Sequence, residues 1–115
     1  PDYLLIELGG NDALRGYPVE KIKFNLIEIC KKAKKQNVTV ILMQIKIPPN
    51  YGRKYTQTFE SLYGEIANEM EILLIPFILE NIALDPNLML PDGIHPNEKG
   101  QPLIADEIYN WLKPL

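Results

Sequence analysis

The chain has 115 residues, of which 46% are hydrophobic and 23% charged, and it carries a net charge of −3. This is the composition of a globular domain rather than of a disordered chain, and the acidic balance argues against nucleic acid as a partner. No apolar run approaches the ~18 residues of a membrane span, and the lone cysteine, Cys30, excludes an internal disulfide and a multi-cysteine metal site.

The predicted elements begin with residues 3–8, a near-continuous apolar run that stops at a pair of glycines. Such a run is typical of a strand buried on both faces of a parallel sheet. A loop is expected over 9–17. A helix then starts at Pro18, with apolar residues recurring every three or four positions, and Asn37 is expected to end it.

The rest of the chain continues the alternation of strands and helices. The predicted order is a strand over 38–45, a loop over 47–52, a helix over 55–70, a strand over 72–78, an irregular or briefly helical segment over 79–91, a loop over 92–96 and a helix over 98–112. Alternating strands and helices predict right-handed crossovers and a single α/β domain, a parallel sheet flanked by helices. Ligands of such sheets bind beyond the carboxyl ends of the strands, where we expect the polar loops to meet.

Asp92 and His95 lie three residues apart in a glycine-containing turn. That spacing lets the carboxylate accept the Nδ1 proton of the imidazole, which would orient the ring and stabilise its charged form in a nucleophile–His–Asp relay. Asp-Gly followed by a proline is also ordinary turn chemistry, with no catalytic role. A metal site is the weaker interpretation, because one histidine would have only carboxylates as co-ligands.

Asn11 follows Gly9 and Gly10 at the predicted end of the first strand. Glycines allow a sharp turn and a close approach of substrate, and the Asn side-chain amide is a donor of the kind an oxyanion hole needs. The alternative is a plain turn in which Asn11 and Asp12 cap their own backbone. The segment matches neither the dinucleotide-binding fingerprint nor a P-loop.

No nucleophile accompanies these two motifs. The only serine, Ser61, falls inside a predicted helix, and Cys30 falls on the buried face of another. The sequence therefore contains candidates for a general base, an orienting carboxylate and an oxyanion donor, but none for the nucleophile.

These motifs resemble the SGNH hydrolases, also called GDSL esterases or lipases, and most closely their bacterial acyl-CoA thioesterase/lysophospholipase/arylesterase type. Residues 8–16, Leu-Gly-Gly-Asn-Asp-Ala-Leu-Arg-Gly, are similar to the family's Gly-x-Asn-Asp block. Residues 43–55 are similar to its next strand and loop, and residues 92–97, Asp-Gly-Ile-His-Pro-Asn, to its Asp-x-x-His block. The resemblance covers essentially the whole chain and implies a three-layer, flavodoxin-like fold.

The resemblance also implies roles for individual residues. Asn11 would donate to the oxyanion, His95 would be general base and then general acid, and Asp92 would orient His95. Asp12 would hold the loop rather than perform chemistry, as Gly9 and Gly10 do. The implied reaction is acyl transfer from a carboxylic ester or acyl thioester to a serine and then to water, with no cofactor and no metal.

Two blocks of the family have no counterpart in the chain, namely the Gly-Asp-Ser block with the nucleophile and a further Gly block. Residues 1–115 are therefore expected to be the C-terminal part of an SGNH hydrolase domain that lacks its N-terminal strands, and to be inactive alone. The strand over 3–8 would become an exposed apolar edge, which predicts an unstable, dimeric or aggregating chain. A periplasmic or secreted location rests on the resemblance only, since no signal peptide can be read.

Apolar residues of two loops are candidates for an acyl-chain groove. They are Leu14, Tyr17, Ile45, Ile47, Pro48 and Tyr51. The alternative is that they merely cover the sheet. Two other functions remain open from the residues themselves: a non-catalytic module that binds an acyl ligand or a partner, and a different flavodoxin-like domain that binds phosphate or a metal.

Overall fold

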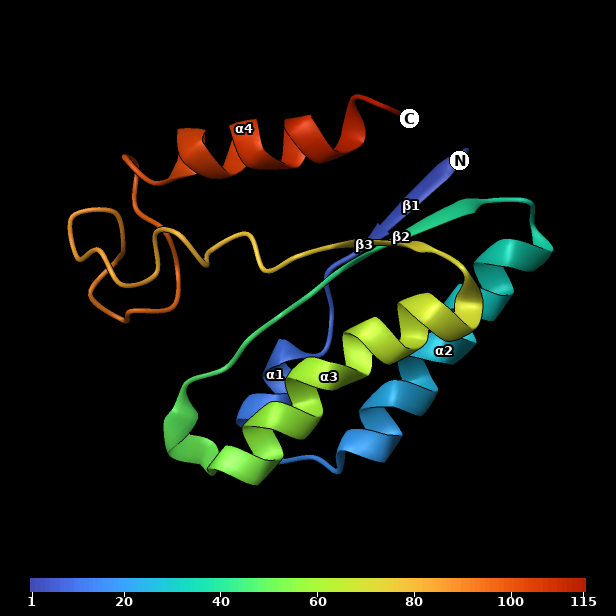
Figure 1. Cartoon of the computed structure of the whole chain (residues 1–115), viewed down its shortest axis with the longest axis horizontal. Helices are drawn as coiled ribbons and strands as arrows, with labels where there is room; N and C mark the ends of the chain where they lie inside the picture. The colour runs from blue at the N-terminus through green and yellow to red at the C-terminus, as the bar shows by residue number, and fades with distance from the viewer. The chain divides into compact units, whose positions relative to one another are not determined.

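Three parallel strands form one sheet in the order β1-β2-β3 (Figure 1). The computed structural model describes all 115 residues. Its elements are β1 (Tyr3–Ile6), α1 (Gly10–Leu14), α2 (Val19–Lys35), β2 (Thr39–Met43), the 3-10 helix η1 (Pro49–Tyr51), α3 (Arg53–Met70), β3 (Leu73–Ile75) and α4 (Gln101–Leu112). The predicted α/β class with a parallel sheet is confirmed. The chain divides into two compact units, residues 1–76 and 77–115.

The core of the first unit lies between the sheet and the helices α2 and α3, which contact each other along one face of the strands (Figure 1). Leu4 and Ile6 of β1 are in register with Val40 and Leu42 of β2, and all four point toward the helices. Phe59 and Tyr63 of α3 meet edge to face, with ring centroids 5.4 Å apart. The fully buried side chains at this interface include Ile22, Cys30, Phe59, Leu62, Tyr63 and Ile66.

The end of α2 agrees with the prediction. Asn37 has a left-handed φ of 60°, and the N–H groups of Asn37 and Val38 donate to the carbonyls of Lys34 and Ala33. This pair of bonds is the Schellman arrangement, which satisfies carbonyls that the last helical turn would otherwise leave unpaired.

The prediction that the first strand is buried on both faces is wrong. β1 covers only residues 3–6 and lies at the edge of the sheet, and Tyr3 and Leu5 are 52% and 40% exposed. Only the face that carries Leu4 and Ile6 packs against the helices. An apolar run indicates a strand but does not reveal which of its faces the fold covers.

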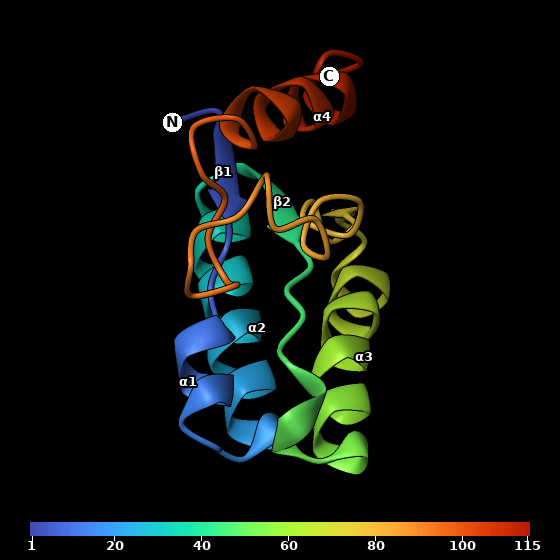
Figure 2. The same ribbon diagram turned by 90° about the vertical axis from the view of Figure 1, so that its left-hand side faces the viewer.

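The loops expected over 9–17 and 47–52 each contain a short helix. The first includes α1, which begins where Gly9 turns the chain at a φ of 112° and accepts the N–H of Ala13. The second includes η1, and Figure 2 shows the segment after β2 running beside α3 to reach it. Elements of three to five residues are too short to show the periodicity by which a helix is predicted.

The second unit consists of turns over 77–100 followed by α4, around a small core of Ile82, Met89 and Ile104. Within α4, Ile104 is buried and the neighbouring Leu103 is 48% exposed. The helix begins at Gln101 rather than at residue 98, and its buried face centres on Ile104 and Ile108. No helix in the structure combines the length and apolar character needed to cross a membrane.

Candidate active site

The structure brings the predicted site residues together in two groups, one in each unit. Asp92 lies with His95 in the second unit, and Asn11 and Asp12 lie with Gly9 and Gly10 in the first.

The Asp92 carboxylate uses its two oxygens differently. Oδ2 lies 2.8 Å from Nδ1 of His95, while Oδ1 accepts the backbone N–H groups of Ile94 at 2.9 Å and His95 at 3.1 Å. One oxygen therefore fixes the turn and the other fixes the ring. With its Nδ1 proton held by the carboxylate, a neutral His95 presents Nε2 as the basic nitrogen.

The electrostatics of Asp92 follow from these three contacts. The hydrogen bond with the His95 side chain, followed by the backbone N–H groups of Ile94 and His95, lowers the pKa of the Asp92 carboxyl to about 2. The carboxylate is therefore charged at any pH near neutrality and can stabilise a protonated imidazole beside it. The predicted contact between the two residues is present; its catalytic role stays a prediction.

The turn that carries this pair is closed by backbone hydrogen bonds. The N–H of Leu90 donates to the carbonyl of His95 at 2.8 Å, and the N–H of Gly93 donates to the carbonyl of Leu90 at 3.0 Å. Gly93 has a φ of 69°, a conformation that suits glycine. An antiparallel bridge between Met89 and Pro96 closes the base of the turn.

Asn97 secures this turn, and its role was missed in the sequence. Its side-chain amide donates to the carbonyl of Asn87 at 2.8 Å, on the opposite side of the turn. Its side-chain oxygen accepts the N–H groups of Lys99 and Gly100, just before α4. An Asn shortly before a helix was the available signal, because such residues commonly satisfy free N–H groups there. The same side chain thus ties the His95 turn to the start of α4.

Asn11 sits in the first turn of α1, and its exposed side chain makes no hydrogen bond. The side chain of Asp12 makes none either, so the alternative in which both residues cap their own backbone is not what the structure shows. An exposed amide with unused donors can receive a ligand oxygen. Gly10, the preceding residue, packs against Ile45: a Cβ added at Gly10 would lie 3.4 Å from the Ile45 side chain.

A side chain of α3 hydrogen-bonds to the backbone of the turn before Asn11. The hydroxyl of Tyr63 donates to the carbonyl of Leu8 at 2.8 Å. At the other end of α1, the hydroxyl of Tyr55 donates to the carbonyl of Tyr17 at 2.5 Å. Burial, with the nearby negative charge of Asp12, raises the pKa of both phenols, so both remain hydrogen-bond donors.

The six candidates for an acyl-chain groove have different surroundings, all within the first unit. Ile47 is buried in the core. The side chains of Leu14 and Ile45 are partly buried and pack against that core. Tyr17, Pro48 and Tyr51 are exposed. Ile47 therefore covers the sheet, whereas the exposed three remain available to a ligand.

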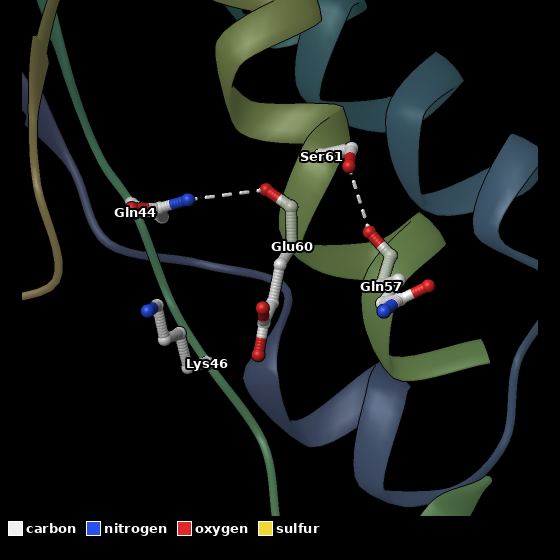
Figure 3. Close-up of a pocket in the computed structure, with 5 residues that line it drawn as sticks. All are labelled: Gln44, Lys46, Gln57, Glu60 and Ser61. Atoms are coloured by element: carbon white, nitrogen blue, oxygen red, sulfur yellow. Dashed lines mark hydrogen bonds between the residues drawn. The ribbon is translucent and has the colours of Figure 1, made fainter. Parts of the chain in front are cut away.

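Ser61 lines a polar pocket of about 400 Å³ beside α3, with Gln44, Lys46, Gln57 and Glu60 (Figure 3). Its hydroxyl donates to the carbonyl of Gln57 one turn earlier, at 2.8 Å, and the amide of Gln44 donates to the carbonyl of Glu60 at 3.2 Å. The Ser61 hydroxyl is thus engaged within its own helix and is not hydrogen-bonded to a basic side chain.

Cys30 is equally unsuited to nucleophilic attack. Its side chain is fully buried, and burial raises the pKa of the thiol, which keeps it in the less reactive protonated form. No group of three His, Cys, Asp or Glu side chains is placed to hold a metal ion.

Comparison with known proteins gives consistent matches over nearly the whole chain. A sequence model described as the GDSL-like Lipase/Acylhydrolase family matches residues 1–103. The Thioesterase 1/protease 1/lysophospholipase L1 of Escherichia coli K12 is 44% identical over 115 residues, which are all of this chain and 55% of that protein. An arylesterase of Vibrio mimicus is 42% identical over 97% of this chain and 56% of its own length.

The fold matches solved esterases as well. The crystal structure of the psychrotrophic esterase EstA from Pseudoalteromonas superposes with a TM-score of 0.95 at 45% identity, covering 99% of this chain and 62% of that one. The chain spans about half the length of the curated relatives it matches.

Proposed function

The chain belongs to the GDSL-like lipase/acylhydrolase family, and from that premise we propose that the protein carrying it is a serine esterase or thioesterase. Its substrates would be carboxylic esters and acyl thioesters, lysophospholipids among them. Relatives of the chain support this substrate class, since they are described as a thioesterase and lysophospholipase and as an arylesterase.

The contact between Asp92 and His95 carries the proposal. Nδ1 of His95 lies 2.8 Å from the carboxylate, which leaves Nε2 to accept the proton of a serine hydroxyl as its oxygen attacks the acyl carbon. When the tetrahedral intermediate collapses, the same nitrogen returns the proton to the leaving alcohol or thiol. A water molecule then repeats both steps on the acyl-enzyme and releases the acid.

Asn11 is proposed to stabilise the negative charge that forms on the acyl oxygen. Its side-chain amide is exposed and has both N–H donors unused, as this role requires. Asp12, Gly9 and Gly10 would shape the turn that presents it.

The nucleophilic serine is proposed to lie upstream of these 115 residues, which would make this chain the C-terminal part of its hydrolase domain and inactive alone. The support is that the Ser61 hydroxyl donates to the backbone carbonyl of Gln57 within α3. The chain also spans only 55% of its E. coli relative.

A phosphonate probe tests both the activity and the place of the nucleophile. EstA is described as inhibited by monoethylphosphonate, so the longer protein would be treated with that compound and digested for mass spectrometry. We expect hydrolysis of p-nitrophenyl esters, its loss in His95→Ala, and a phosphonate adduct on a serine outside residues 1–115. An adduct on Ser61, or activity that survives His95→Ala, would overturn the proposal.

The isolated chain has a second proposed property, self-association through β1. Tyr3 and Leu5 expose apolar surface on an edge strand, and such an edge is a template for pairing with another strand. A binding or interaction module without catalysis is the alternative function that this surface favours.

A further inference from the structure

Tyr63 is a polar side chain in the middle of an apolar core. It is fully buried, its ring meets Phe59 edge to face, and its hydroxyl donates to the carbonyl of Leu8, 55 residues earlier in the chain. The ring fills the core while the hydroxyl reaches the backbone where β1 has ended and the turn toward Asn11 begins.

The turn and the phenol fit each other closely. Gly9 has a φ of 112°, and a Cβ added there would lie 2.5 Å from the Tyr63 hydroxyl oxygen. Only a residue without a side chain leaves room for this oxygen. The place of the Leu8–Gly9 peptide is therefore set by Tyr63.

A second phenol holds the far end of the same segment. Tyr55, also on α3, donates to the carbonyl of Tyr17 at 2.5 Å, three residues beyond α1. A helix of five residues such as α1 has little stability of its own. Two side chains of the 18-residue helix α3 thus hydrogen-bond to the two ends of the segment 8–17, and Asn11 lies between these two bonds.

We propose that Tyr63 and Tyr55 are positioning residues for ester hydrolysis, an inference that rests on the proposed function. Tyr63 sets the place of the Asn11 amide relative to the acyl oxygen. Tyr55 sets the course of residues 13–17, which carry the candidate groove residues Leu14 and Tyr17. Neither phenol touches the substrate, and each acts through the segment that it holds.

Tyr63→Phe in the longer, active protein tests the first half of the inference. The variant keeps the ring and removes only the hydrogen bond to Leu8. We expect kcat to fall by about tenfold or more with KM changed less than twofold, because a misplaced oxyanion donor weakens transition-state binding. Tyr109→Phe, the same change on an exposed residue of α4, serves as the control. A folded Tyr63→Phe protein with unchanged kcat would overturn this role.

Tyr55→Phe tests the second half and covers the case in which Tyr63→Phe does not fold, since Tyr55 is only half-buried. We expect KM to rise about threefold or more for long-chain p-nitrophenyl esters and to rise less for the acetate, whose acyl chain is too short to fill a groove lined by Leu14 and Tyr17. Equal effects on every chain length would contradict a role in the groove.

Hydrogen exchange separates this inference from the proposed function. In both Tyr→Phe variants we expect the amides of residues 9–17 to exchange at least tenfold faster, with no change in Tyr109→Phe. If the unsubstituted protein hydrolyses no ester, the proposed function fails, and the exchange rates alone then decide whether the phenols fix the segment. Unchanged exchange rates in both variants would show that the two phenol hydrogen bonds do not hold this segment in place.

Discussion

His95 and Asp92 are joined twice: Nδ1 of the ring lies 2.8 Å from Oδ2, and the backbone N–H of the same histidine donates to Oδ1 at 3.1 Å. The carboxylate therefore positions both the main chain and the side chain of the residue that it orients. A substitution at Asp92 is expected to disturb the base in both respects.

Asp92→Asn is predicted to lower kcat by three to four orders of magnitude, on the order of the loss expected when the imidazole is held in the wrong tautomer. The Asn oxygen can still accept the backbone N–H groups, so the fold of the turn should persist. Steady-state hydrolysis of p-nitrophenyl butyrate by the longer protein measures this. Asp106→Asn, an exposed carboxylate on α4, should retain full activity. A loss of less than tenfold in Asp92→Asn would refute the assigned role.

The depressed pKa of Asp92 predicts a pH-dependent contribution to stability. The folded state holds the pKa at about 2 against an ordinary 3.8, so the unfolded chain binds the proton more readily between these values. Stability from this group is thus present above about pH 4 and is lost as the pH falls toward 2. Urea unfolding of this chain and of Asp92→Asn should converge across that window. A difference that stays constant from pH 5 to pH 2 would exclude the linkage.

Asn97→Ala is predicted to destabilise the second unit by about 1–3 kcal/mol, because it removes a cap and a cross-turn bond at once. Asn97→Asp keeps the acceptor for Lys99 and Gly100 but loses the donor to Asn87, so a smaller loss is expected. Thermal unfolding followed by circular dichroism compares the two. Equal stability of both variants and the parent would show that the side chain does not hold the turn.

Thr56→Val is predicted to stabilise the protein by about 0.5–1 kcal/mol. The hydroxyl of Thr56 is buried and has no hydrogen-bond partner, and valine has nearly the same shape without the polar atom. Thr58→Val is the matched control on the same helix, since Thr58 is exposed and bonds only to the carbonyl of Lys54. A loss of stability in Thr56→Val, measured by urea denaturation, would mean that the hydroxyl has a partner in solution.

Leu5→Lys is predicted to reduce self-association of the isolated chain, because a charge on an edge strand opposes pairing with a second strand. Analytical ultracentrifugation across a concentration series gives the oligomeric state. Phe24→Lys, an equally apolar but helical surface position on α2, should leave association unchanged. If the parent chain is a monomer at every concentration, the proposal for β1 fails.

Local patterns account for what the sequence predicts well. The apolar periodicity of α2 and α3 identifies Leu26, Phe59 and Ile66 as buried, and the short spacing of Asp92 and His95 predicts their contact. The contact of Tyr63 with Leu8 could not be predicted, since the sequence marks Tyr63 only as apolar and gives no sign of where its hydroxyl points. The edge position of β1 agrees with the expectation of an exposed strand, whereas its apolar run by itself predicts burial on both faces.

The two parts of the proposed site differ in the sequence separation of the contacts that form them. The Asp92 pair and its turn close between Asn87 and Gly100, whereas the turn before Asn11 is complete only when Tyr63 reaches back across 55 residues to Leu8. Short-range contacts form early in folding, and long-range ones wait for loop closure. On refolding, the base and its carboxylate should therefore assemble first, and recovery of activity should follow the docking of α3.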